Sequence, residues 1–168
     1  QVTHHWWHRS MSRHTVDDLQ AIADAIVAMA EPGEQIEANV ARSRETDIRV
    51  YNGDLEHFVS AQSQGISVRV IKDGRTGSSH AGTLDEVAWR EVLAEARENA
   101  TLGSVDEWAG LAEPDGVAIV EQELWDDTLD AFDTAKKIEI AKELERAAVG
   151  ADPRVRIDDS NYSDGATE

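Results

Sequence analysis

The sequence predicts an α+β fold, in which an antiparallel meander of five or six strands is covered by about three helices. Three segments carry apolar residues at three- and four-residue steps, which is the period of a helix that packs on one side. Residues 34–82 instead alternate between apolar and polar side chains, as half-buried strands do. Two dipeptides in that region, Asn52-Gly53 and Asp73-Gly74, are typical of two-residue hairpin turns, which join antiparallel neighbours.

The first helix is expected to begin after Thr15, because its hydroxyl can cap free backbone N–H groups, and to stop at Glu31-Pro32-Gly33. Its apolar stripe predicts packing against a sheet. The alternating region then predicts strands over residues 36–41, 48–50, 55–62, 66–70 and 75–81.

The second helix is predicted to start at the capping box Thr83-Leu84-Asp85-Glu86 and to run to about Ala100, with Trp89 at the edge of the core. The third is predicted from about Thr134 to Val149. Gly150 is expected to end it, and residues 154–158 are expected to form a strand. The apolar face predicted for the third helix consists of Ile138, Ile140, Ala141, Leu144 and Ala148.

Residues 101–132 lack a clear period but contain many large apolar side chains, which a disordered linker would not keep. The expectation is an ordered, extended segment that holds Trp108 and Trp125 against the body. A short strand at Val117–Glu121 is compatible with the pattern.

Composition excludes several functional classes. The formal net charge of −18 opposes binding to nucleic acid, because phosphates require a basic face. No apolar run approaches the length of a membrane span, so no membrane association is expected. The chain has no cysteine, which excludes disulfides and thiolate metal sites and suits a cytoplasmic location.

Residues 1–14 form a separate segment that contains no acidic residue. The interpretation is an N-terminal extension outside the fold. His4 and His8 would share one face of a helix, a spacing that can bind a divalent metal adventitiously. No third fixed ligand lies nearby in the sequence, so no metal site is assigned.

No catalytic residue is assigned either. His57 lies on a predicted strand, and His80 follows Ser78-Ser79 near a hairpin end, but neither belongs to a recognisable catalytic motif. The segment Gly74–Ser79 has the glycine spacing of a phosphate loop. It lacks the Gly-Lys-Ser/Thr ending and the helix that should begin there, so a hairpin is the better interpretation.

Four segments in a fixed order carry a family resemblance: Gly65–Val70, Asp73–Ser79, Leu124–Leu129 and Gly150–Val155. In this order they resemble the N-terminal domain of the TldD/PmbA family of metallopeptidase-related proteins, with the turn at residues 72–79 closer to the PmbA (TldE) side. The zinc motif of that family, His-Glu-x-x-x-His, is absent from this sequence.

After the N-terminal extension at residues 1–14, the resemblance implies an α+β domain at 15–159 and a junction towards a C-terminal domain at 160–168. It implies a non-catalytic domain that frames a substrate chamber for small or unfolded peptides. The partner would be a TldD-like metallopeptidase subunit or a second copy, and zinc would be held by the metal-bearing subunit or domain. The alternative is a free-standing α+β module that binds a peptide or protein without enzymatic activity.

One prediction follows from the ligand count. A chain that lacks residues 1–14 should hold no stoichiometric zinc, because residues 15–168 provide two histidines and no cysteine, whereas catalytic zinc takes three protein ligands. Elemental analysis after dialysis measures this. One tightly held zinc ion per chain would contradict the prediction.

Overall fold

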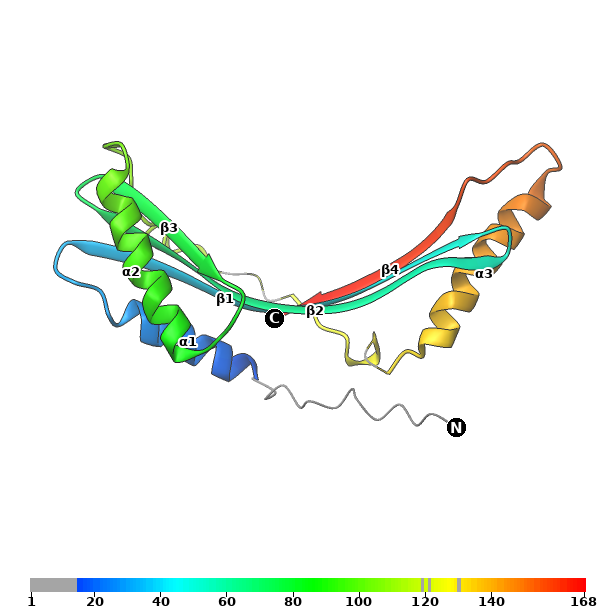
Figure 1. The fold of residues 1–168 in the computed structure, drawn as a ribbon, viewed down its shortest axis with the longest axis horizontal. Coiled ribbons are helices and arrows are strands. Elements are labelled where there is room, and N and C mark those ends of the chain that lie inside the picture. The colour runs from blue at the N-terminus through cyan, green and yellow to red at the C-terminus, as the bar shows by residue number, and fades with distance from the viewer. Residues whose placement is uncertain (1–14, 119, 121, 130) are drawn as a thin grey trace. The chain divides into compact units, whose positions relative to one another are not determined.

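The computed structural model describes residues 15–118, 120, 122–129 and 131–168. The four strands form one sheet in the order β3-β2-β1-β4, and the pairs β2–β3 and β1–β4 are antiparallel. Along the chain (Figure 1) the elements are α1 Val16–Val27, β1 Glu34–Tyr51, β2 Asp54–Lys72, β3 Arg75–Ala81, α2 Glu86–Leu102, the 3-10 turn η1 Asp127–Leu129, α3 Thr134–Ala151 and β4 Ser160–Thr167.

The α+β class and the antiparallel sheet are confirmed, but the sheet has four strands rather than five or six. The difference arises because strands predicted separately are continuous. The polar stretch 42–47 belongs to β1, and residues 63–65 belong to β2. Residues 43–50 of β1 pair with β4, so backbone hydrogen bonds sustain the strand where apolar alternation is lost.

The described residues divide into two compact units. The first consists of residues 15–41, 64–111 and 168, and the second of residues 42–63 and 112–167. Strands β1 and β2 contribute residues to both.

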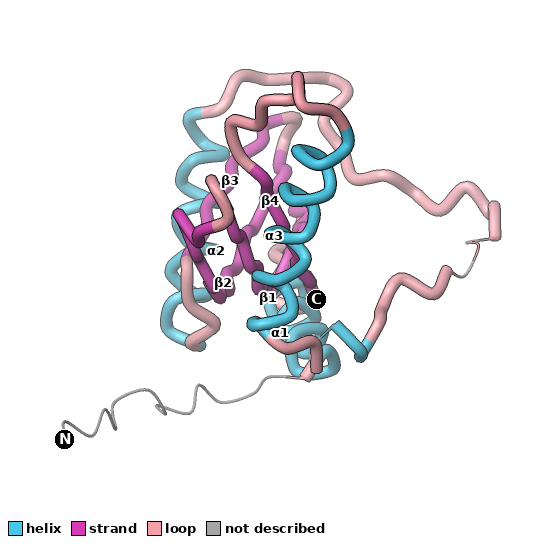
Figure 2. The backbone as a smooth tube through the Cα atoms, turned by 90° about the vertical axis from the view of Figure 1, so that its right-hand side faces the viewer, coloured by secondary structure: helices cyan, strands magenta, loops and turns pink. Residues whose placement is uncertain are grey.

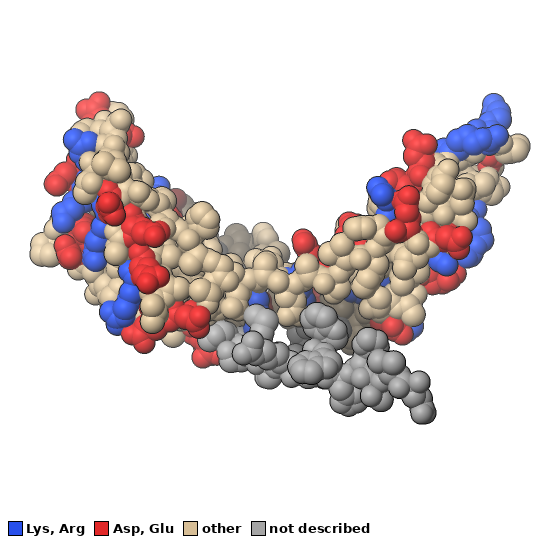
Figure 3. Space-filling view, viewed as in Figure 1, with Lys and Arg blue, Asp and Glu red and all other residues tan. Residues whose placement is uncertain are grey.

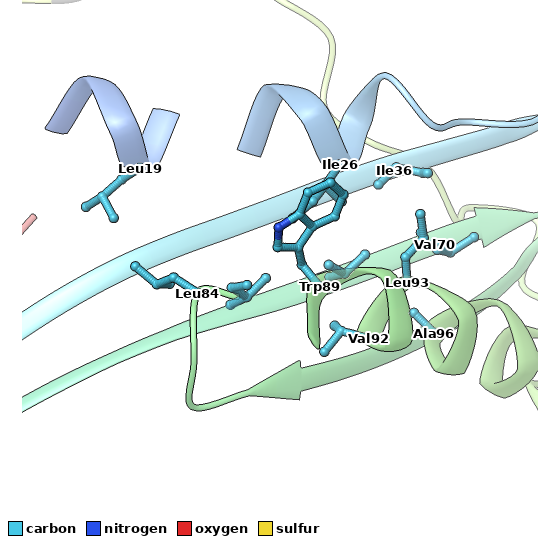
Figure 4. Close-up of a cluster of buried hydrophobic side chains, with 11 residues drawn as sticks. Leu19, Ile26, Ile36, Val70, Leu84, Trp89, Val92, Leu93 and Ala96 are labelled. Atoms are coloured by element: carbon cyan, nitrogen blue, oxygen red, sulfur yellow. The ribbon is translucent and has the colours of Figure 1, made fainter. Parts of the chain in front are cut away.

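In the first unit, α1 and α2 bury their apolar stripes against β1 and β2 (Figure 4). The core combines Ile26 of α1 and Leu93 of α2 with strand residues such as Val70. Trp89 is 8% exposed and packs in this cluster, close to the predicted position at the edge of the core. The buried members are Leu19, Ile26, Ile36, Ile66, Val68, Val70, Leu84, Trp89, Val92, Leu93 and Ala96.

One predicted helix cap is confirmed and the other is wrong. Thr15 caps α1 in a capping box with Asp18, where the Thr15 hydroxyl accepts a hydrogen bond from the Asp18 backbone N–H at 3.2 Å. Helix α2 begins at Glu86, with Asp85 as its N-cap. Glu86 is therefore the first helical residue and not the third, as a box with Thr83 would require, and the Thr83 hydroxyl donates to the Asp85 carboxylate instead.

Helix α2 lies directly on β3, and Gly77 makes this close approach possible. A Cβ atom at residue 77 would lie 2.1 Å from the Ala100 backbone nitrogen and 2.2 Å from the Ala96 carbonyl oxygen. Both obstructing atoms belong to the helix backbone, so no side-chain rotation could relieve the overlap. Gly77 therefore sets the spacing between α2 and the sheet.

In the second unit, α3 lies beside β4 and β1 (Figure 2), over a small core of Ile48, Val50 and Ala141. The predicted apolar face of α3 is partly wrong, because Leu144 is 55% exposed and Ile140 is 41% exposed. The helix instead buries Lys137 and Glu145 on either side of Ala141. Both charged side chains have partners in the unit, which explains how the helix can be rotated relative to the prediction.

The end of α3 also differs from the prediction. The helix continues through Gly150 to Ala151 and stops before Pro153, and residues 154–158 form no strand. The last strand is β4, Ser160–Thr167, which lies in the polar segment that was expected to be a junction. Its pairing with β1 depends on backbone groups, so a segment with few apolar side chains suffices.

The segment between α2 and α3 does not hold both tryptophans against the body. Trp108 is 84% exposed, which contradicts the prediction, whereas Trp125 is 41% exposed and lies under the Arg44 guanidinium at 5.6 Å from the ring centroid. The described residues between 117 and 121 form no strand. Among the helices that the structure describes, none is long and apolar enough to cross a membrane.

A substitution at Gly77 tests the close packing. Gly77→Ala should reduce the free energy of unfolding by about 1–3 kcal/mol or more, because the added methyl overlaps the α2 backbone. Urea unfolding followed by circular dichroism measures this.

Gly82→Ala is the matched control, since nothing lies within 4 Å of the added Cβ, and its effect should stay within about 0.5 kcal/mol. Equal stability of the two variants would show that α2 does not depend on Gly77.

Candidate functional site

The first unit contains a cavity of about 280 Å³ between the end of the sheet and the last turns of α2. Its polar wall has three cationic side chains and two carboxylates, and its apolar wall includes Val70 and Ala100. The lining residues are Glu34, Val70, Lys72, Asp73, Arg75, Arg97, Ala100 and Thr101. Acidic and basic side chains are interspersed over α2 (Figure 3).

The carboxylate of Glu34 is the centre of the ion pairs in this wall. The Glu34 side chain is 2% exposed, and it accepts hydrogen bonds from Arg97 Nε at 3.1 and 3.2 Å and from Nη2 at 2.9 Å. Arg97 Nη2 also donates to the Met29 carbonyl at 2.7 Å. Lys72 Nζ lies 3.5 Å from the Glu34 carboxylate. The carboxylate thus connects the end of α1, β1, β2 and α2.

These contacts set the protonation of Glu34. Burial opposes its ionisation, but hydrogen bonds from Arg97 and the Glu31 backbone, together with the charges of Arg97 and Lys72, outweigh it. The pKa of Glu34 is therefore lowered from its ordinary value. The carboxylate is an anion at neutral pH and serves as an ion-pair partner rather than a proton acceptor.

The turn between β2 and β3 forms the opposite wall of the cavity. Asp73 and Gly74 both have positive φ, as a two-residue hairpin turn requires, and the Asp106 backbone N–H donates to the Gly74 carbonyl at 2.7 Å. The Arg75 guanidinium donates to the carbonyl of Gly103. The turn is thereby fixed to the segment that follows α2.

The second unit contains a smaller cavity of about 130 Å³, beside a buried cluster of Lys137, Tyr162 and Asp164. Lys137 Nζ lies 2.7 Å from the Asp164 carboxylate, and these side chains are 9% and 13% exposed. The lining residues are Arg44, Glu45, Thr46, Ser60, Ala61, Gln62, Leu129, Lys137 and Asp164.

The cluster holds Asp164 ionised and Tyr162 neutral. Burial works against the Asp164 charge, but hydrogen bonds from Lys137, Tyr162 and Thr46 overcome it and lower the pKa of Asp164. Burial, the hydrogen bond to Asp164 and its negative charge raise the pKa of Tyr162 to about 12. At neutral pH neither group is poised to transfer a proton.

A second carboxylate in the second unit binds backbone rather than side chains. Glu145 of α3 accepts hydrogen bonds from the backbone N–H groups of Asn52, at 2.8 Å, and Gly53, at 2.6 Å. These residues form the turn between β1 and β2, where both have positive φ. Glu145 therefore fastens the hairpin turn to the helix.

The histidines singled out in the sequence are not brought together. His57 lies on β2 and His80 on β3, and both are exposed. His4 and His8 lie outside the described residues. Within the described ranges, no group of three or more histidine, aspartate or glutamate side chains is placed to hold a metal ion.

Sequence reasoning missed the residues of both cavities. One signal was available for the first, since the Asp73-Gly74 turn makes Lys72 and Arg75 direct cross-strand neighbours. Arg97, Lys137 and Asp164 gave no such signal. Charged residues are frequent in this sequence, and the partners of these three become visible only in the folded structure.

Three solved structures share the fold over most of this chain. They are a candidate modulator of a DNA gyrase from Thermotoga maritima (23% identity, TM-score 0.68), a candidate modulator of DNA gyrase from Bacteroides thetaiotaomicron (22%, 0.72) and TldE from Thermococcus kodakarensis (20%, 0.65). They match 88%, 92% and 90% of this chain. The chain spans only 33%, 36% and 32% of their lengths.

The fold and its cavities define an α+β domain in which the buried charges pair with one another and with backbone. Residues 36–100 match the family model described as PmbA/TldA metallopeptidase domain 1. The resemblance seen in the sequence is therefore confirmed over residues 36–100, which are similar to the first domain of the TldD/PmbA family. No curated protein matches the chain significantly.

A substitution at Glu34 tests the ion pairs that this residue forms with Arg97 and Lys72. Glu34→Gln should lower the free energy of unfolding at pH 7 by about 1–3 kcal/mol, because it leaves Arg97 without its anionic partner. Since the folded-state pKa of Glu34 is lowered, its stabilisation is complete above the ordinary pKa of 4.5 and is lost as the pH falls through the folded-state pKa. The difference between wild type and variant should therefore narrow on acidification.

Urea unfolding of both proteins between pH 7 and about pH 3 measures this difference. Glu91→Gln serves as the control, because Glu91 is exposed on α2, the helix that carries Arg97, and its removal should have little effect. A difference that widens as the pH falls would reverse the assigned direction of the pKa shift.

Proposed function

We propose that this chain serves a TldD/PmbA-type metallopeptidase system as a non-catalytic N-terminal domain. It frames the substrate chamber and contacts a second subunit during hydrolysis of small or unfolded peptides. The observation that carries this proposal is the match of residues 36–100 to the first domain of that family. The chain spans about a third of each similar structure, so catalysis is assigned to a different part of the assembly.

The chemistry of the described residues supports a non-catalytic role. Glu34 and Asp164 are held ionised by cations, and Tyr162 is held neutral, so neither cluster offers a base beside a nucleophile. Zinc is assigned to the metal-bearing subunit or domain, where it would polarise the scissile carbonyl and activate water. The partner is a TldD-like subunit or a second copy, and the assembly is cytoplasmic.

The alternative is a free-standing peptide-binding module, and one feature favours it. β3 pairs with β2 only between Ile66 and Lys72, so in the second unit residues 54–63 of β2 have no strand on their outer side among the described residues. An open strand edge can bind an extended peptide through main-chain hydrogen bonds. Such a module would bind peptides without any metallopeptidase subunit.

Co-assembly distinguishes the two functions. The purified chain should show no peptidase activity on an unfolded peptide, with or without added zinc, since neither charged cluster offers a poised base beside a nucleophile. When mixed with the TldD-like subunit of the same organism, it should co-elute in one complex. Size-exclusion chromatography with light scattering and a fluorogenic peptide assay measure both results.

A TldD-like subunit from a distant organism is the control for non-specific association. Peptide binding without co-elution would favour the free-standing module. Zinc-dependent cleavage that follows the peak of the chain alone would overturn the non-catalytic assignment.

A further inference from the structure

The cavity of the first unit has an uncompensated positive charge at Arg75. Arg97 is neutralised by Glu34, which is bonded to it through both Nε and Nη2. Arg75 donates one hydrogen bond, to the neutral carbonyl of Gly103, and no described carboxylate lies within 4 Å of its guanidinium. Asp73 lines the same cavity, but among the described residues it forms no ion pair with Arg75. The remaining N–H donors of Arg75 are therefore available to a ligand.

Lys72 adds a second cation at the same place. It pairs directly with Arg75 across the β2–β3 hairpin, an arrangement in which like charges repel and destabilise the sheet. Its ammonium lies 3.5 Å from Glu34 and 3.8 Å from Glu31, beyond the 2.7–2.9 Å typical of a charge-assisted hydrogen bond. An anion between Lys72 and Arg75 would relieve the repulsion and use donors that the described residues leave unfilled.

The remaining wall limits what that anion is attached to. Val70 and Ala100 give the cavity an apolar side, which suits a ligand that carries an apolar group beside its charge. A volume of about 280 Å³ lies near the lower end of the range of small-molecule sites, roughly 300–1,000 Å³. This space suits one terminal residue rather than a long peptide.

The wall is also fixed before any ligand binds. The Gly74 carbonyl accepts from the Asp106 backbone N–H, and a Cβ at residue 74 would lie 3.0 Å from the Asp106 carbonyl oxygen. Arg75 is tied to Gly103 in the same segment. The two cations therefore stand on a turn held from outside, which lowers the ordering cost of binding.

We propose that Lys72 and Arg75 bind the C-terminal carboxylate of a peptide whose last residue is apolar, with that residue against Val70 and Ala100. The guanidinium provides paired N–H donors for the carboxylate and the ammonium a compact second charge. This site rests on the proposed function, because it assigns peptides as the ligand class. It gives the domain a role in retaining peptide ends.

Isothermal titration of the whole chain with acetyl-Gly-Gly-Ala-Leu tests the site. The free acid should bind saturably, and the same peptide with a C-terminal amide should bind at least about tenfold more weakly, because the amide cannot form the ion pairs. Equal binding of acid and amide, or no binding of either, would overturn the proposal.

Variants locate the site. Arg75→Gln and Lys72→Gln should each weaken binding of the free-acid peptide by about tenfold or more. Arg75→Lys, which keeps the charge, should weaken this binding less. Arg146→Gln is the matched control, since it removes one positive charge from an exposed position on α3 and should leave binding unchanged. A thermal melt checks that Arg75→Gln is folded, and Lys72→Gln carries the test if it is not. Unchanged affinity in Lys72→Gln would reject the site.

Competition identifies the source of the carboxylate. Acetyl-leucine should compete weakly and inorganic phosphate hardly at all, because phosphate has no apolar group for Val70 and Ala100. If phosphate competed as well as the peptide, the site would bind anions in general rather than a peptide terminus, and the proposal would be wrong. Loss of peptide binding with intact co-assembly would reject this site alone. Peptide binding without co-assembly would keep the site and reject the proposed assembly.

Discussion

The carboxylate of Glu34 is the interaction on which the first unit depends. It is almost fully buried, yet it lies at the first residue of β1, where the chain leaves the turn after α1. Arg97 of α2 and Lys72 of β2 reach it from two sides. A buried anion without such partners would be strongly unfavourable, so the ends of four elements must come together for the charge to be tolerated.

The second unit also buries charged side chains, and different groups neutralise them. Helix α3 buries few of its apolar residues, and its contact with the sheet is made by Ala141 between two charged side chains. Lys137 pairs with Asp164 of β4, and Glu145 binds the turn of the β1–β2 hairpin. Directional ionic contacts thus replace part of the apolar area that a core of this size lacks.

The sequence allowed the elements with strong local signals to be predicted. The Asn52-Gly53 and Asp73-Gly74 turns, the Thr15 cap and the apolar stripes of α1 and α2 depend on neighbouring residues, and these were found. The strand Ser160–Thr167 was missed, because its stability comes from pairing with residues more than a hundred positions away. The face of α3 was misjudged, since a helical stripe cannot show that Lys137 and Glu145 have partners elsewhere.

The candidate sites were even less accessible to sequence reasoning. Arg75 and Lys72 flank a recognisable turn, but their significance depends on Arg97 being already neutralised by Glu34, which only the tertiary structure shows. The family resemblance indicated the class of domain without indicating either cavity. Val70, Asp73 and Arg75 lie in segments that carry the resemblance, but only the fold shows that they line one cavity.

The contact between Glu145 and the β1–β2 turn also bears on the chemical ageing of the protein. Asn-Gly is the dipeptide most prone to deamidation, because the glycine nitrogen can attack the asparagine side chain and form a succinimide. Here that nitrogen, on Gly53, donates a hydrogen bond to the Glu145 carboxylate at 2.6 Å. This hydrogen bond holds the attacking atom in place in the turn. The same carboxylate that fastens the hairpin therefore restrains the nitrogen on which succinimide formation depends.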